Sequence, residues 1–305
     1  MVRVLSVGVA VIDHVFRVDS FPTRPEKYRA KSADMVGGGG GANAAVAIRR
    51  LGGEAWLAAR VGDDAIAGTI LGDLAGEGVR TDLVRRFEGR RSSFSSVLVD
   101  DRGERQIVNY RDMGLSFDAG WLRERLGAMR FDAVLADTRW PEGALAAMER
   151  AAALGVPGVM DAEAPVHEAI DAVRAASHVV FSAQGLRDFA ARGDSGADGD
   201  LEALLRDADG TLDGLVGVTD GPDGVRWLAG GQLRHEPAPS PPGPIADTLG
   251  AGDVWHGALA LALGEGQGLD TAMRFANAAA TLKCVGGTGR SGTPTRGEVE
   301  DFLAR

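Results

Sequence analysis

The order of apolar segments along the chain predicts an α/β protein. The short apolar runs that indicate its strands are residues 4–7, 55–60, 132–136, 156–160, 178–181 and 214–219. The segments with helical spacing of apolar positions include residues 42–51, 64–77, 251–263, 269–283 and 297–304. Because strands that alternate with helices are joined by crossovers, we expect a mostly parallel sheet with helices on both faces. Residues 237–244, rich in Pro and Gly, should form a loop.

A second group of strand-like segments does not fit this parallel core. These segments are residues 14–19, 28–36, 94–99 and 105–110. The last two flank Asp100-Asp101-Arg102-Gly103, which is typical of a hairpin turn. We therefore expect a small antiparallel sheet, within residues 12–36 and 94–110, inserted into a single domain of residues 1–305. A sheet this small needs its apolar face covered, so we also expect a homodimer that pairs through it.

Composition narrows the class of protein further. The 305 residues suffice for one α/β domain with a small appendage. No run of 18 apolar residues occurs and the chain starts directly on a strand-like segment, so we expect neither a membrane span nor a signal peptide. The single Cys284 suits a reducing, cytoplasmic compartment. The net charge of −10 argues against nucleic acid as a partner.

The run DTLGAGD at residues 247–253 carries the strongest indication of function. It leads into a predicted helix, so the backbone amides of Gly250, Ala251 and Gly252 lie at a helix N-terminus. Such an end binds anions, because its first N–H groups lack partners within the helix and the helix dipole is positive there. Asp253 follows in the first turn of the helix. A carboxylate at this position would repel a phosphate, so its presence there indicates a chemical role such as accepting a proton. An anion site beside a base indicates phosphoryl transfer.

A second glycine-rich segment spans residues 37–41 and is followed by Asn43. Glycines let the backbone approach a ligand closely, and the Asn side chain offers both a donor and an acceptor to hydroxyl groups. The competing interpretation is a dinucleotide-binding loop, which requires G-x-G-x-x-G directly after the first strand. The chain has GVA at residues 8–10 in that place. Residues 8–13 end the first strand with the carboxylate of Asp13, near the edge where open α/β sheets bind ligands. A solvent-exposed Asp in a loop is the alternative.

Residues 247–259 resemble the signature of the ribokinase-like (PfkB) family of sugar kinases, D-T-x-G-A-G-D-x-F-x-G-A-L, with Trp255 where the family usually has Phe. Residues 38–43 resemble the family's G-G-x-x-x-N signature. The resemblance implies a ribokinase-like fold whose small sheet is a lid over the sugar. It also implies ATP and Mg²⁺ as cofactors and leaves a monovalent cation open. Asp253 would be the base, the amides of 250–252 would hold the phosphoryl group, and the sugar would contact Asp13, Gly39, Gly40 and Asn43.

Two further segments resemble the nucleotide side of the same family. VTDGPDG at residues 218–224 resembles V-T-x-G-x-x-G, which implies contacts from Thr219, Gly221 and Gly224; an ordinary hairpin turn is the alternative. A later segment resembles the lining of the adenine pocket, and its matching residues are Asn277, Ala280, Lys283 and Gly287. For Lys283 the alternative is a basic residue that stabilises a helix C-terminus.

One departure from the family concerns the metal. Many members carry N-x-x-E at the end of a central strand, where the Glu helps to organise Mg²⁺. The corresponding stretch here is SAQG at residues 182–185, with no carboxylate at the fourth position. The sequence therefore leaves the metal ligands unknown.

A finer resemblance is to bacterial 6-deoxy-6-sulfofructose kinases, which phosphorylate O1 of that sugar in sulfoquinovose breakdown. The matching segments are EKY at 26–28, IVNY at 107–110, LADTRW at 135–140 and LKC at 282–284. It implies that Lys27, Asn109 and Arg139 hold the sulfonate at C6; solvated surface side chains are the alternative for Lys27 and Arg139. Asn43 departs from it, because GAN at 41–43 stands where a Pro-Ala-Ala-Thr-like run can occur, and Asn is more typical of ketohexokinases and ribokinases.

The alternatives to a sulfofructose kinase are of two kinds. Another kinase specificity, for fructose, fructose 6-phosphate or a nucleoside, would keep the same machinery. A catalytically silent sugar-binding protein would lack the base or the anion site, and the sequence has both.

Overall fold

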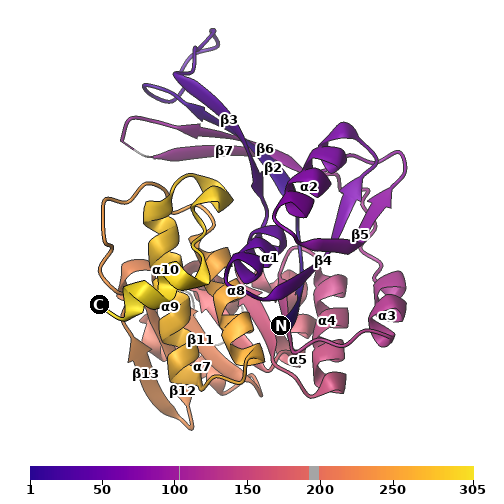
Figure 1. Cartoon of the computed structure of the whole chain (residues 1–305), viewed down its shortest axis with the longest axis vertical. Coiled ribbons are helices and arrows are strands. Elements are labelled where there is room, and N and C mark those ends of the chain that lie inside the picture. Colours follow the sequence, from indigo (N-terminus) through magenta and orange to yellow (C-terminus); the bar gives the residue numbers. More distant parts are fainter. Residues whose placement is uncertain (103, 192–198) are drawn as a thin grey trace.

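The computed structural model describes residues 1–102, 104–191 and 199–305; Gly103 of the predicted hairpin turn lies outside them. Its strands form a nine-stranded sheet flanked by helices and a separate four-stranded sheet that stands above one edge of the larger one (Figure 1). This is the ribokinase-like α/β architecture expected from the sequence. Among the described residues, no helix is long and apolar enough to cross a membrane.

The large sheet has the strand order β13-β12-β11-β10-β9-β8-β1-β4-β5. Its strands are β1 (Arg3–Val7), β4 (Glu54–Gly62), β5 (Arg80–Phe87), β8 (Ala133–Asp137), β9 (Gly158–Ala162), β10 (His178–Ser182), β11 (Leu215–Thr219), β12 (Val225–Ala229) and β13 (Gln232–Glu236). The pairings from β5 across to β11 are parallel, and β12 and β13 add an antiparallel hairpin at one edge. The mostly parallel core is confirmed, whereas β5, β12 and β13 were not predicted.

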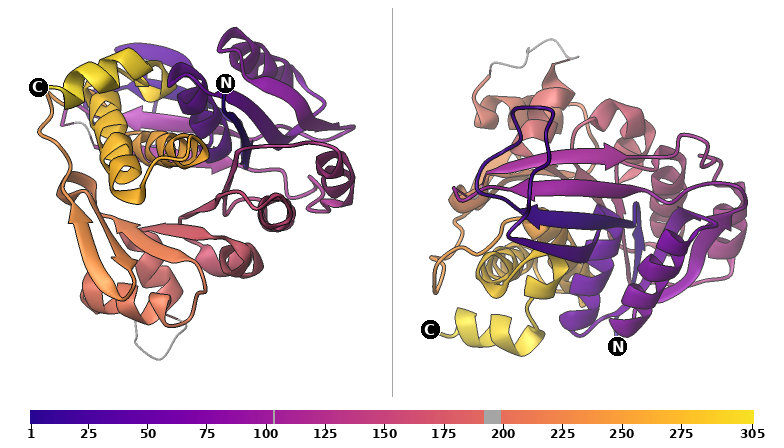
Figure 2. Two further views of the ribbon diagram at one scale, coloured as in Figure 1. Left: turned by 60° about the horizontal axis from the view of Figure 1, so that its bottom comes forward. Right: turned by 90° about the horizontal axis from the view of Figure 1, so that it is seen from above.

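Helices cover both faces of this sheet (Figure 2). They are α1 (Gly40–Arg50), α2 (Ala65–Gly76), α3 (Gly120–Gly127), α4 (Pro141–Leu154), α5 (Ile170–Ala175), α6 (Ala183–Ala190), α7 (Leu201–Asp209), α8 (Ala251–Gly264), α9 (Leu269–Gly286) and α10 (Arg296–Leu303). Neighbouring residues of a strand point to opposite faces, and Val4 of β1 accordingly belongs to an apolar cluster with α1, α8 and α9. Leu5 belongs to another with α3, α4 and α7.

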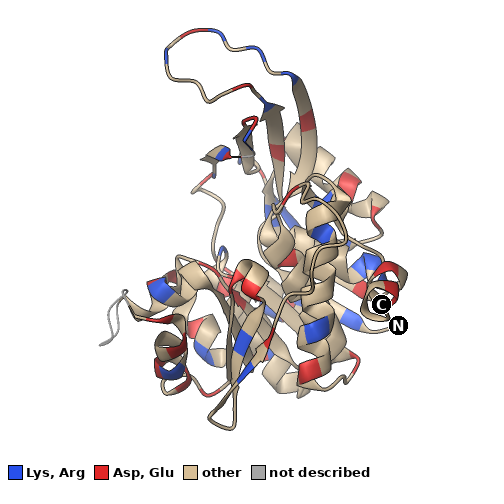
Figure 3. Cartoon of the chain, turned by 90° about the vertical axis from the view of Figure 1, so that its left-hand side faces the viewer, with Lys and Arg blue, Asp and Glu red and all other residues tan. Residues whose placement is uncertain are grey.

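The small sheet has the order β3-β2-β6-β7, from strands β2 (Val11–Arg17), β3 (Ser32–Gly38), β6 (Phe94–Val99) and β7 (Arg105–Tyr110). It consists of two antiparallel pairs, β2 with β3 and β6 with β7, joined by a parallel pairing of β2 with β6. Residues 18–31 form a loop that projects beyond this sheet and carries many charged side chains (Figure 3). The expected strands 14–19 and 28–36 were too long at these ends, because residues 18–19 and 28–31 belong to the loop. Pro22 and Pro25 lack the N–H groups that a continuous strand pairing would need.

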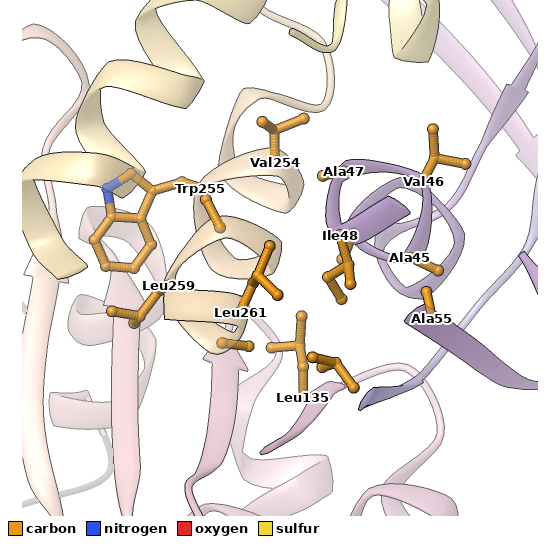
Figure 4. Close-up of a cluster of buried hydrophobic side chains, with 14 of the residues drawn as sticks. Ala45, Val46, Ala47, Ile48, Ala55, Leu135, Val254, Trp255, Leu259 and Leu261 are labelled. Carbon is orange, nitrogen blue, oxygen red and sulfur yellow. The ribbon is translucent and has the colours of Figure 1, made fainter. Parts of the chain in front are cut away.

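Close packing of α1 against α8 brings the two glycine-rich motifs together. Apolar side chains of both helices, among them Ile48 and Leu261, pack over Leu135 of the sheet (Figure 4). Gly257 permits this approach, because a Cβ at that position would lie only 2.8 Å from the carbonyl oxygen of Ala44. The N-termini of α1 and α8 consequently lie side by side beneath the small sheet.

Candidate active site

The carboxyl ends of the central strands gather the acidic residues of the site. Asp137 ends β8, Asp161 lies near the end of β9, and Asp253 occupies the first turn of α8. Open α/β sheets bind ligands at this edge. The small sheet stands over the same edge, so a ligand here would lie between the two sheets (Figure 1).

Asp253 and Asn43 are in direct contact. The Asn43 side-chain amide donates to the Asp253 carboxylate, with Nδ2 and Oδ2 2.7 Å apart. Burial raises the pKa of Asp253 from 3.8 to about 6; the Asn43 bond opposes the shift, and the negative charges of Glu163 and Asp137 add to it. A carboxylate with a pKa near 6 is ionised at neutral pH and still basic enough to accept a proton.

The glycine-rich segment is held by Asp137, a residue to which sequence reasoning assigned no role. One Asp137 oxygen accepts the backbone N–H groups of Val9 and Gly41, both at 3.0 Å, and the other accepts that of Arg139 at 2.9 Å. A Cβ on Gly40 would lie 3.1 Å from Asp137 Oδ2 and 3.4 Å from Asp253 Oδ1. Glycine at this position therefore lets the backbone pass close to both carboxylates.

Asp13 lies within β2 of the small sheet and not at the end of the first strand, which stops at Val7, so the expected position was wrong. Its side chain is directed at the same glycine segment. It is buried, with 8% of its surface exposed, and a Cβ on Gly38 would lie 2.2 Å from its Oδ2. Burial raises the pKa of Asp13, while a hydrogen bond with Ser95 and the charge of Arg290 lower it. The structure thus brings Asp13 and Asn43, two predicted sugar contacts, to one glycine-rich turn beside Asp253.

Arg290 is a second residue that sequence reasoning missed. Its guanidinium is buried and donates from Nη2 to the carbonyl oxygen of Gly38 and from Nη1 to Asp73 of α2, both at 2.9 Å. Its positive charge lowers the pKa of both Asp13 and Asp253. Arg290 therefore anchors the glycine segment and offsets part of the negative charge of the site. Its signal in the sequence is weak, because it stands in an ordinary Gly- and Ser-rich loop.

The N-terminus of α8 has the geometry of an anion site. Gly250 caps the helix in a left-handed conformation with φ of 80°, and the first intrahelical bond runs from the Val254 N–H to the Gly250 carbonyl. A Cβ on Gly252 would meet no atom of the described residues within 4 Å, which leaves open space beside this turn. One detail differs from expectation: the Ala251 N–H already donates to the Thr248 carbonyl at 3.2 Å. The Ala251 amide is thus less available to an anion than expected.

A cavity of ≈ 630 Å³ extends from this helix end along the sheet edge. This volume lies within the usual range of small-molecule sites. Its walls include Gly252 of α8 and the predicted nucleotide contacts Thr219, Gly221, Gly224, Asn277 and Ala280. One end of the cavity therefore adjoins the anion site at the N-terminus of α8, and the rest of its lining is largely apolar. This arrangement suits a nucleoside phosphate, which has an anionic end and an apolar base.

Comparison with known proteins agrees with this geometry. The family model for pfkB family carbohydrate kinases matches residues 1–296. The chain belongs to the PfkB family. It is 29% identical to a ribokinase from Bacillus subtilis, over all of both chains, and 30% identical to an ATP-dependent ribose-1-phosphate kinase from Halopiger xanaduensis, over 100% of this chain and 99% of the relative.

Among solved structures, a putative ribokinase from Agrobacterium tumefaciens superposes with a TM-score of 0.90 and 35% identity over 99% of each chain. This PfkB protein is an ATP-dependent carbohydrate kinase. The large cavity has a volume that suits a small molecule, and Asp253 directly follows Gly252, one of the residues that line it.

Two predicted adenine contacts of the PfkB kinase lie elsewhere. Lys283 and Gly287 are not among the described residues that line the large cavity. The Lys283 side chain is fully buried and bound to Asp247, and Gly287 lies at the end of α9. Asn277 does line the cavity, although its Nδ2 donates to the Glu236 carbonyl and its Oδ1 accepts from Trp255, so its side chain also ties α8 to α9 and β13.

The residues present fit a nucleotide-bound Mg²⁺ ion. The SAQG stretch offers no ligand, because Ser182 caps α6 and Gln184 is exposed. Asp161 and Glu163 instead lie at the end of β9, where burial and the charge of Asp253 raise the pKa of Asp161 well above its usual value. No group of three His, Cys, Asp or Glu ligands occurs among the described residues. Nucleotide-bound Mg²⁺ usually needs only one or two carboxylates besides phosphates and waters.

The three predicted sulfonate contacts come from separate segments. Lys27 lies in the exposed 18–31 loop and Asn109 on the exposed strand β7, whereas Arg139 follows β8 and forms a 2.9 Å ion pair with Glu163. Two further arginines meet Arg139: Arg60 and Arg111 each donate to its carbonyl oxygen, at 3.4 and 2.5 Å. Arg60, Arg111 and Arg139 are called the arginine group below.

Proposed function

We propose that this kinase transfers the γ-phosphoryl group of ATP to O1 of 6-deoxy-6-sulfofructose, giving its 1-phosphate and ADP. The hydroxyl oxygen attacks the γ-phosphorus while Asp253 takes the hydroxyl proton. The bond from the γ-phosphorus to the bridging oxygen breaks, and that oxygen leaves with ADP. The amide end of α8 offsets negative charge on the transferring group, which is the main catalytic task in phosphoryl transfer.

The sugar would be oriented by Asp13 and Asn43 over the glycine-rich turn. Asp13 can accept hydrogen bonds from two ring hydroxyls. The Asn43 Oδ1 atom is buried and has no partner among the described residues, so it is available to a sugar hydroxyl beside Asp253. Gly39 and Gly40 have no side chains, so the sugar ring can come close enough to the backbone to contact both Asp13 and Asn43.

The arginine group is the observation that carries the anionic-sugar part of the proposal. Arg60 and Arg111 lie against each other with carbonyl oxygens as their hydrogen-bond partners, and together they line a small recess with Val9. Burial and the neighbouring charge of Arg111 lower the pKa of Arg60 to about 10. Two like charges side by side are costly unless an anion offsets them. A sulfonate at C6 would supply that anion.

Asp161 and Glu163 are the residues proposed to hold Mg²⁺ together with the ATP phosphates. Bound there, the ion would neutralise phosphate charge as the γ-phosphoryl group transfers. Placing two carboxylates at the end of β9 would compensate for the missing Glu of the SAQG stretch.

The lid supports the proposal of a homodimer. Both edge strands of the small sheet expose apolar side chains: Met35 of β3 is 58% exposed, and Ile107 and Val108 of β7 are 52% and 70% exposed. Unpaired edges of this kind favour pairing with another chain. A second lid would cover these side chains, and it would also place the projecting 18–31 loop with Lys27 against its neighbour.

A substrate panel with ATP tests the proposed function. We expect the highest kcat/KM for 6-deoxy-6-sulfofructose, a poor reaction with fructose, and a 1-phosphate as product by ³¹P NMR. Fructose 6-phosphate belongs in the panel because its phosphate carries about −1.5 to −2 charge at neutral pH, against one negative charge on a sulfonate. No turnover of any sugar would instead favour a silent sugar-binding protein.

Ribose is the second candidate substrate. The Bacillus relative and the Agrobacterium structure are both described as ribokinases, and Asn43 is typical of that group. Ribose has no anion to meet the arginine group, so the two candidates differ in one measurable quantity, the ratio of their kcat/KM values.

A further inference from the structure

A fully buried ammonium group lies directly behind the anion site. Lys283 of α9 has no exposed surface, and its Nζ donates to the carbonyl oxygen of Asp247 at 2.9 Å. The same Nζ lies 3.6 Å from Asp247 Oδ2. Asp247 begins the short loop that leads through Gly250 into α8, so Lys283 is attached to the segment that shapes the phosphate-binding turn.

The oxygens of Asp247 are already occupied by other donors. Oδ1 accepts from Arg105 Nη2 at 2.7 Å and from the Leu249 N–H at 2.9 Å, and Oδ2 accepts from the Gly289 N–H at 2.8 Å. Arg105 belongs to strand β7 of the lid, whereas Lys283 belongs to the core. One buried carboxylate is therefore paired with two cationic side chains, one from the small sheet and one from the core.

These contacts address whether a monovalent cation binds at this loop, a question that the family resemblance did not decide. An alkali ion in a protein is bound by carbonyl and carboxylate oxygens, such as those of Asp247. Here each of these oxygens has a donor, and an added ion would stand beside the charges of Lys283 and Arg105. Like charges at such separations repel strongly at low dielectric. The residues of this loop therefore do not fit an additional cation.

We propose that Lys283 serves as a built-in monovalent cation for the phosphate-binding loop, so that this kinase needs no added K⁺, Na⁺ or NH₄⁺. Burial lowers the pKa of Lys283, and the negative charge of Asp247 opposes that shift. The ammonium neutralises Asp247 and fixes its carbonyl oxygen, and it thereby positions the loop up to Gly250. Lys283 is a positioning residue, since its side chain is fully buried and is not among the described residues that line the large cavity. The proposal requires the kinase activity and is independent of which sugar is phosphorylated.

The first test uses the wild-type kinase. Turnover is measured in choline chloride and then with choline replaced by KCl, NaCl or NH₄Cl at constant ionic strength, using whichever sugar of the panel reacts. We expect the same kcat in all four salts. Activation by K⁺ or NH₄⁺ of about fivefold or more, the lower end of typical coupling between two ligand sites, would overturn the proposal.

The second test uses Lys283→Met, which keeps the length of the side chain and removes its charge. We expect this variant to lose activity in choline and to regain part of it with K⁺ or NH₄⁺. The matched control is Lys31→Met, because Lys31 is exposed and forms its ion pairs with Asp19 and Asp101, away from Asp247. This control should respond to salts as the wild type does.

A thermal melt of the same variants provides a readout that needs no sugar. K⁺ should raise the Tm of Lys283→Met above its value in choline and leave the wild-type Tm unchanged. Full activity of Lys283→Met in choline, or loss of activity without rescue by any of the ions, would contradict the proposal. If Lys283→Met does not fold, the wild-type salt comparison decides. Failure of the sugar assignment would leave the melt and the salt comparison unaffected.

Discussion

The Asn43 side chain donates a 2.7 Å hydrogen bond to the Asp253 carboxylate, although the two residues stand 210 positions apart in the chain. The contact exists because α1 and α8 pack closely enough to bring their N-termini together. It fixes the orientation of the Asp253 carboxylate and leaves Asn43 Oδ1 for a substrate hydroxyl. One hydrogen bond thus joins the two family motifs, and it links the proposed base to a proposed sugar contact.

Turnover should depend on Asp253. In Asp253→Asn the side chain keeps its shape and loses its basicity, so we expect kcat to fall by roughly 10²–10⁴-fold, the usual contribution of a positioned base. ATP affinity, measured by calorimetry, should remain close to the wild-type value because Asp253 does not bind the nucleotide base. A variant with near-native kcat would show that another group takes the proton.

The pH dependence of the reaction should report the same residue. The pKa of Asp253 is raised to about 6, so its carboxylate becomes protonated, and hence inactive as a base, as the pH falls through that value. We expect kcat/KM to decrease about tenfold per pH unit below pH 6, as for a single essential base. A profile that stays flat down to pH 4.5 would exclude Asp253 as the titrating base.

The raised pKa also predicts how the base affects stability. Asp253 binds its proton more tightly in the folded protein than in the unfolded chain. Its contribution to the free energy of unfolding is therefore complete below about pH 4 and is lost as the pH rises through 6. Asp253→Asn, which cannot ionise, should raise the free energy of unfolding at pH 8 by up to about 3 kcal/mol, at 1.36 kcal/mol per pKa unit. Urea unfolding at pH 4 and pH 8 measures this; a larger gain at pH 4 would contradict the sign.

Gly252→Ala should separate folding from nucleotide binding. The added Cβ would meet no atom of the described residues within 4 Å, so the fold and the Tm should be preserved. The methyl group would instead occupy the open space beside the α8 amides. We expect a higher KM for ATP and a lower kcat in steady-state assays. Gly68→Ala is the matched control. Its Cβ would also meet no described atom within 4 Å, and Gly68 lies in α2, outside the residues that line the cavity. Equal kinetics of the two variants would contradict the assigned phosphate position.

The lid should form the contact between two copies of the chain. We expect a dimer by light scattering at micromolar concentration, and we expect Val108→Lys, which places a charge on the exposed edge strand β7, to dissociate it. A monomeric wild type, or a dimer unaffected by the substitution, would remove the lid as the interface.

The sequence was informative where chemistry is local. Asp253 and the glycines before it share one helix N-terminus, so a seven-residue run indicated both the proposed base and the proposed anion site. The strands of the core were predicted because both of their faces are buried and their sequences are continuously apolar. Strand β5 was missed because it lies at the sheet edge and Leu83 is its only buried residue. The β12–β13 hairpin had a usable signal in Gly230 and Gly231, both with positive φ.

Contacts between segments that are distant in the sequence could not be predicted from local sequence patterns. Lys283 matched an adenine-pocket segment by its spacing, yet its side chain turns away from the cavity to Asp247. Arg290 and Asp137 each bind the glycine-rich turn across long stretches of sequence, and nothing in their local sequence indicates those partners. Which way a helical side chain points depends on packing with other elements, which spacing alone does not determine.

The ratio of kcat/KM for 6-deoxy-6-sulfofructose to that for fructose tests the central claim most directly. Leaving the arginine group without its anion should cost roughly 2–5 kcal/mol, the cost of removing one member of a buried charge pair, or about 30- to 4,000-fold at 1.4 kcal/mol per decade. We therefore predict a wild-type ratio above about 30 on the same scale, a lower ratio in Arg139→Ala, and an unchanged ratio in Arg123→Ala, whose arginine pairs with Glu149 on the outer helices. A wild-type ratio of one or less would contradict the claim of an anionic sugar and leave the kinase assignment in place.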